Sequence, residues 1–128
     1  MMPQARTRAQ RAMQVLRWVQ ANWPIGRQVV VEWHDEIIDD EGKPCDGDTG
    51  REGRKLVMRL SRKRNRTIRE TTDTVIHECV HMIQWPVAGP AEDPIDHHPP
   101  AFGAQYWEIR DRFDHHGGAE DASEFGWE

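Results

Sequence analysis

The sequence predicts a single α+β domain. Along the chain, an N-terminal helix is followed by the strands of a small β-sheet and then by two further helices. Length is the first reason, because 128 residues leave room for one hydrophobic core. Composition is the second, because 37% hydrophobic and 30% charged residues are typical of globular proteins. The third is the order of the periodic patterns along the chain, which is helix, strand, strand, helix, helix.

Residues 5–22 have the periodicity of an amphipathic helix. The apolar positions at helical spacing are Ala9, Ala12, Met13, Leu16, Val19 and Trp23. Arginine and glutamine occupy most of the other side, and Pro24 ends the segment. The β-branched run that follows predicts a strand at 28–33.

Residues 39–54 are a turn-rich connection with four glycines, one proline and several aspartates. We assign them no regular structure, and their composition suits the tip of a mobile hairpin. Apolar residues resume at 55–60, where a second strand is expected.

A capping box predicts the start of the next helix. Thr67 suits the N-cap, and Glu70 follows three residues later. The helix should run to about Trp85, because Pro86 cannot continue it. Residues 86–98 are a loop rich in proline and acidic residues, and Pro99-Pro100 suits the first turn of a last helix.

The last helix should present one apolar side to the core. Its members, spaced by four, three and four residues, are Phe102, Tyr106, Ile109 and Phe113. We therefore place the domain at residues 1–113. Residues 114–128 carry five acidic side chains and no lysine or arginine, and they are expected to form an acidic, flexible C-terminal tail.

Several features bear on compartment and partners. No apolar run approaches the roughly 18 residues of a membrane span, so no membrane partner is expected. The N-terminus lacks the apolar region of a secretory signal, and a cytoplasmic protein is expected. Cys45 and Cys79 form no C-x-x-C pair, so we expect two free thiols, with Cys79 a small core residue.

The most informative motif is H-E-x-x-H, formed by His77, Glu78 and His81 within the predicted second helix. Side chains four residues apart project from the same helix face, so both imidazoles can bind one zinc ion. Glu78 lies at the flank of that face, where it can reach a water molecule without binding the metal. The pattern predicts one Zn²⁺ per chain, with Glu78 as the general base of a hydrolase.

A catalytic zinc needs a third protein ligand. The sequence offers His97 and His98, and further along the chain Glu108, His115 and His116. The extended motif of the metzincins is absent, because Gln84 and Val87 stand where it requires glycine and histidine. The residues alone leave the third ligand open.

The segment from His98 to Phe102 resembles the H-G-x-x-F element of SprT-like zinc metallopeptidases, with Pro99 in place of the usual glycine. The resemblance covers roughly residues 55–113. It implies a minimal zincin-like domain, His98 as the third metal ligand, and Phe102 as an aromatic that packs beneath the site. It also implies a metalloendopeptidase that acts on protein or peptide substrates.

The resemblance places the substrate on an edge strand, which we expect at residues 55–60, bound through main-chain hydrogen bonds. Tyr106 and His97 are candidates for stabilising the oxyanion, although Tyr106 also suits the core. Asp73 lies one turn before His77 and is a candidate for orienting an imidazole.

Two other functions fit the sequence. One is a metal-stabilised module that binds nucleic acid or protein without catalysis, through the basic segment Arg59–Arg69. We do not favour nucleic acid as a partner, because the segment lacks interleaved aromatic residues and the whole chain carries a net charge of −5. The other is a helical interaction domain without metal.

Overall fold

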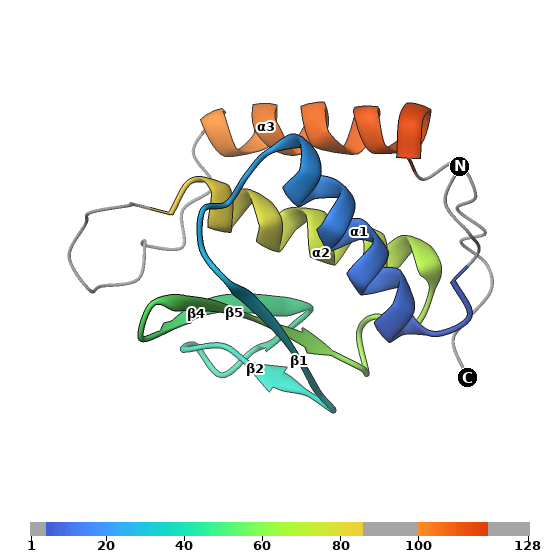
Figure 1. The fold of residues 1–128 in the computed structure, drawn as a ribbon. Coiled ribbons are helices and arrows are strands. Elements are labelled where there is room, and N and C mark those ends of the chain that lie inside the picture. The colour runs from blue at the N-terminus through green and yellow to red at the C-terminus, as the bar shows by residue number, and fades with distance from the viewer. Residues whose placement is uncertain (1–4, 86–99, 118–128) are drawn as a thin grey trace.

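The structure, a computed structural model, describes residues 5–85 and 100–117. It is a mixed α+β arrangement, as predicted (Figure 1). The helices are α1 (Arg8–Asn22), α2 (Ile68–Ile83) and α3 (Pro100–Arg112), and a π-helical turn, η1 (Phe113–Gly117), continues α3. The strands are β1 (Val29–His34), β2 (Ile37–Ile38), β3 (Pro44–Cys45), β4 (Gly47–Glu52) and β5 (Lys55–Ser61). None of the described helices is both long and apolar enough to cross a membrane.

Helix α1 begins three residues later than predicted, because Thr7 is its N-cap. The Thr7 hydroxyl accepts a hydrogen bond of 3.1 Å from the backbone N–H of Gln10. This satisfies one of the backbone donors that the first turn of a helix leaves unpaired. The apolar side of α1 is buried, with Val15 and Val19 fully covered.

The three-stranded sheet has the order β1-β5-β4, with β5 parallel to β1 and antiparallel to β4. Strand β5 is therefore central, and the expectation that residues 55–60 form an edge strand is wrong. The physical reason lies in its side chains, because Leu56, Met58 and Leu60 are completely buried. A strand with this much buried apolar surface is stabilised by neighbours on both sides.

Strands β3 and β4 lie in the segment to which we assigned no regular structure. Strand β4 pairs with β5 from Gly47, opposite Leu60, to Glu52, opposite Lys55. Gly53 has a φ of 62°, a backbone conformation that residues with a side chain rarely adopt. It is the first residue of the tight turn between the two strands. Pairing with an apolar partner strand thus overrides the weak β-propensity of the sequence Gly-Asp-Thr-Gly-Arg-Glu.

The predicted N-cap of α2, Thr67, is confirmed. The Thr67 hydroxyl accepts a hydrogen bond of 3.1 Å from the backbone N–H of Glu70. The Glu70 carboxylate in turn accepts one of 3.0 Å from the backbone N–H of Arg66, one residue before the cap. The helix ends at Ile83, two residues before its predicted end.

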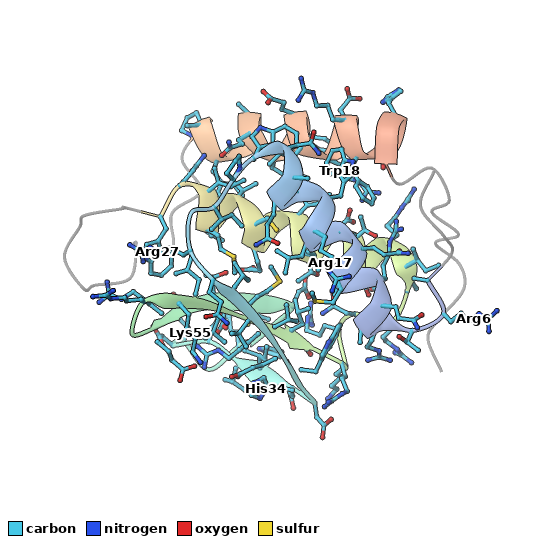
Figure 2. All side chains as sticks on the ribbon, in the orientation of Figure 1. Arg6, Arg17, Trp18, Arg27, His34 and Lys55 are labelled. Carbon is cyan, nitrogen blue, oxygen red and sulfur yellow. The ribbon has the colours of Figure 1, made fainter. Side chains whose placement is uncertain are left out.

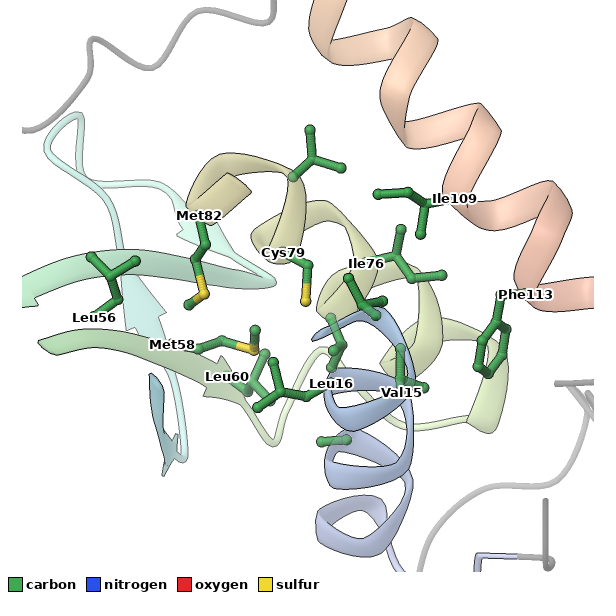
Figure 3. Packing of buried hydrophobic residues seen from close by; sticks show 14 of the residues in the cluster. Val15, Leu16, Leu56, Met58, Leu60, Ile76, Cys79, Met82, Ile109 and Phe113 are labelled. Carbon is green, nitrogen blue, oxygen red and sulfur yellow. The ribbon is translucent and has the colours of Figure 1, made fainter. Parts of the chain in front are cut away.

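The core lies between one face of the sheet and helices α1 and α2, and α3 covers the far side of α2. Helix α2 lies between α3 and the sheet, with α1 beside it (Figure 1). In the close-up, side chains of β5 face side chains of α2 and α1, while α3 and η1 complete the cluster (Figure 3). The labelled members are Val15, Leu16, Leu56, Met58, Leu60, Ile76, Cys79, Met82, Ile109 and Phe113.

Phe113 is fully buried, so the end of the last helix is anchored in the core. The first four residues of the predicted tail, 114–117, continue this helix as the turn η1. Residues 118–128 lie outside the described part of the chain.

We predict that Gly47→Ala destabilises the fold by about 1–3 kcal/mol through overpacking. A Cβ at Gly47 would lie 2.8 Å from the carbonyl oxygen of Arg59 and 3.0 Å from Cγ2 of Thr74. Gly50 in the same strand is the matched control, because the nearest atom to its added Cβ would be at 3.5 Å. Gly47→Ala should lower the urea midpoint far more than Gly50→Ala, and equal shifts would contradict this placement of β4.

Candidate metal site

Helix α2 brings His77, Glu78 and His81 together. One candidate ligand atom from each lies within 4.8 Å of those of the other two. The imidazole rings are 5.0 Å apart between centroids and inclined at 71°. Two nitrogen ligands of one zinc ion lie about 4 Å apart or less, since each bond is about 2.0–2.1 Å long. The candidate ligand atoms of His77 and His81 lie close to that separation, so the two histidines could hold one metal ion.

Phe102 of α3 packs against both imidazoles. Its ring centroid lies 4.8 Å from that of His77 and 4.6 Å from that of His81. Gln84, just after α2, donates a hydrogen bond of 2.8 Å from Nε2 to Oε1 of Gln105 on α3. Helix α3 therefore restrains the orientation of both rings, with Phe102 in contact with each of them.

Glu78 is almost completely buried, with an exposed fraction of 4%. Its Oε1 accepts a hydrogen bond of 2.8 Å from the hydroxyl of Thr49 in β4, and its Oε2 lies 4.0 Å from Nε2 of His77. A buried carboxylate needs such donors, because burial without partners is costly for a charge. Thr49 is a site residue that the sequence analysis missed, since no local pattern connects positions 29 residues apart.

A polar cluster on α2 and α3 lies beside the site. The Tyr106 hydroxyl donates a long hydrogen bond of 3.4 Å to Oδ1 of Asp73, and Arg110 forms an ion pair of 3.4 Å with the same oxygen. The Tyr106 ring is 6.4 Å from that of His77. Burial, together with the negative charge of Asp73, raises the pKa of Tyr106 to about 12. Tyr106 is therefore protonated at neutral pH and can donate a hydrogen bond.

The described residues place only part of the predicted ligand set. His97 and His98 lie outside the described residues, so His98 remains a prediction as the third ligand. Glu108 is exposed on α3 and does not belong to the group of ligand atoms. His115 is also exposed, and a hydrogen bond to the carbonyl oxygen of Asp111 raises its pKa.

Both cysteines are free thiols, as predicted. Cys79 is fully buried in the core, and burial raises the pKa of its thiol well above the usual range. Burial and neighbouring carboxylates, chiefly that of Asp48, raise the pKa of Cys45 to about 11. Both thiols therefore remain protonated at neutral pH.

Acidic residues before β5 neutralise much of the basic segment Arg59–Arg69. The ion pairs are Arg59–Asp48 at 2.8 Å, Arg62–Asp35 at 2.9 Å, Lys63–Glu36 at 3.9 Å and Arg64–Asp46 at 2.6 Å. Cations that already face carboxylates attract phosphate less strongly. The pairing therefore weakens the case for nucleic acid as a partner of this segment.

Comparisons of the chain with models of protein families, with curated proteins and with solved structures find no match. The assignment of a function therefore depends on the residues of the site itself.

We predict that Tyr106 titrates near pH 12 in the folded protein, against 10.0 for an unperturbed tyrosine. Because it is the only tyrosine, ultraviolet absorbance of its phenolate reports on this group alone. The folded state holds this proton more tightly than the unfolded state. Its contribution to stability is therefore fully present below pH 10 and is lost as the pH rises towards 12. A midpoint near 10, with circular dichroism unchanged, would contradict the arrangement.

Proposed function

We propose that the chain is a zinc-dependent metalloendopeptidase with a minimal, SprT-like and zincin-like architecture. The observation that carries the proposal is the buried Glu78, held by Thr49 within the same cluster as two histidines spaced for one metal. An exposed glutamate between two surface histidines would indicate no particular function. A carboxylate buried beside two candidate ligands, with one oxygen held by a hydroxyl, has the arrangement expected of a general base.

In this proposal His77, His81 and His98 hold one zinc ion. A bound zinc ion supplies Lewis-acid chemistry, which acidifies a water molecule and polarises the carbonyl of the scissile peptide bond. Glu78 accepts the proton of the attacking water and then delivers it to the leaving amine nitrogen. Thr49 keeps the Glu78 carboxylate in one orientation by donating to Oε1. Tyr106 is protonated beside His77 and is a candidate donor to the developing oxyanion.

We place the proposed substrate peptide along the outer edge of β4, because β5 is the central strand. Among the described residues β4 pairs only with β5, so its outer edge has backbone groups for an added strand. Thr49 is in the middle of β4 and contacts Glu78, so a peptide paired with β4 would pass the general base. Main-chain hydrogen bonds would hold such a substrate in register along β4.

The alternative of a metal-stabilised binding module without catalysis has less support. It would use the same two histidines, but it gives no role to the buried Glu78 and its bond to Thr49. Its proposed binding surface, the basic segment, is largely paired with acidic residues of the chain.

We predict about one zinc ion per purified chain, lost in both His81→Ala and His98→Ala, as measured by mass spectrometry of metal content. Each substitution removes a nitrogen ligand, and the remaining two ligands hold zinc weakly. Zinc retained in His98→Ala would move the third ligand to His97 or Glu108. No zinc in the parent protein, even after reconstitution, would end the proposal.

We predict that Glu78→Gln keeps its zinc but no longer cleaves peptides. The amide cannot accept a proton from water, whereas the metal ligands are unchanged. Cleavage of a random-sequence peptide library, read by mass spectrometry, avoids any assumption about the substrate. Glu41→Gln is the matched control, because Glu41 is exposed and its one ion pair among the described residues is with Lys43, at 3.6 Å. Cleavage by Glu78→Gln at the rate of the parent would refute the assigned role.

We predict that Thr49→Val lowers kcat about tenfold, with KM little changed, because the hydroxyl acts on the reacting carboxylate and not on the substrate. Thr49→Ser keeps the hydroxyl and should restore kcat. A loss in Thr49→Ser equal to that in Thr49→Val would instead indicate a packing defect.

A further inference from the structure

A cavity of about 470 Å³ lies at the end of the sheet where the turn between β4 and β5 meets the residues before β1. Among the described residues its lining holds Arg27, Arg51, Arg54 and Lys55, with Gln28 and two glycines, and no acidic residue. Figure 2 shows Arg27 and Lys55 at the same end of the molecule, with Arg6 at the other. A cleft lined by charges of one sign concentrates its field on ions of the opposite sign.

This end of the sheet differs from the other end of β5. There, Arg62 and Arg64 each lie within 3 Å of an aspartate oxygen. In the described part of the chain, the structure pairs none of Arg51, Arg54 and Lys55 with a carboxylate, although the chain has a net charge of −5. Arg51, Arg54 and Lys55 therefore carry positive charge that no ion pair among the described residues balances, although Glu52 lies opposite Lys55 in the ladder.

The cavity adjoins β4, the strand that carries Thr49, because Arg51 of β4 is part of its lining. Side chains alternate between the two faces of a strand, so Gly47, Thr49 and Arg51 share one face of β4. That face is the α2 side, because Thr49 contacts Glu78 and a Cβ on Gly47 would meet Thr74 of α2. Arg51 is thus two residues, roughly 7 Å, along the same edge strand from the residue that contacts Glu78.

We propose that this cavity binds an acidic side chain of an extended peptide that pairs with the outer edge of β4. Arginine guanidinium groups present paired N–H donors that match a carboxylate. A peptide residue opposite Arg51 on the outer edge of β4 would place its side chain on the same face as Arg51, at the margin of the cavity. The inference rests on the proposed function only in treating that peptide as a substrate. If the peptide is a substrate, the cavity favours Glu or Asp about two residues along the peptide from the residue that lies beside Glu78.

The test uses two peptides that carry a neutral fluorophore and differ only in three adjacent residues, which are Glu in one and Gln in the other. Binding is measured by fluorescence anisotropy on zinc-loaded Glu78→Gln protein, so that the peptides are not cleaved. We expect the Glu peptide to bind about tenfold more tightly at low ionic strength. The preference should weaken at high salt, because the cavity is open to solvent.

Two double variants that remove the same charge at different places show which residues cause the preference for the Glu peptide. Adding Arg51→Gln and Arg54→Gln should abolish it, with binding of the Gln peptide unchanged. Arg62→Gln with Arg64→Gln removes the same charge at the far end of β5, roughly 23 Å away, and should leave the preference intact. Equal affinity for the two peptides, or an equal loss in both double variants, would overturn the proposal.

Cleavage by the parent protein separates this inference from the peptidase proposal. Preferential binding of the Glu peptide that depends on Arg51 and Arg54, with no cleavage of the random peptide library by the zinc-loaded parent protein, would refute the peptidase and leave the acidic-peptide site. Cleavage of both peptides with equal kcat/KM and equal affinity would leave the peptidase and refute the site.

Discussion

The structure depends on one helix with two different faces. The apolar face of α2 packs on β5 and α1, and Val75, Ile76, Cys79 and Val80 are completely buried there. This packing sets the rotation of α2 about its axis, because any other rotation would expose those side chains to water. With the rotation set, His77 and His81 must point towards α3, and Glu78 must point towards β4. The candidate site is thus a consequence of how the core is filled.

Strand β4 connects the fold to the proposed chemistry. Its pairing with β5 completes the sheet, its Thr49 holds the buried Glu78, and its Arg51 lines the cationic cavity. A short polar strand at the edge of a sheet is stable here because its neighbour is strongly apolar. The same position leaves its outer backbone groups available for a peptide. One element therefore orients the proposed general base and offers the proposed substrate a place beside it.

Charge is distributed unevenly along the sheet. At one end, aspartates and glutamates from the segment around β2, β3 and β4 face Arg59, Arg62, Lys63 and Arg64. At the other end, the structure pairs none of Arg51, Arg54 and Lys55 with a carboxylate of the described residues. Exposed ion pairs of this kind contribute little to stability individually. Because these ion pairs neutralise the cations at their end of the sheet, the attraction for anions is concentrated at the cavity.

Local patterns in the sequence determined much of this architecture. The capping box at Thr67, the spacing of His77 and His81, and the buried positions of the last helix all depend on neighbours within one or two turns. Such contacts follow from helical periodicity. The position of β5 in the sheet, the existence of β4, and the bond from Thr49 to Glu78 were decided only by the tertiary structure. Each joins residues far apart in the chain, and strand order depends on how buried surface is shared across the whole core.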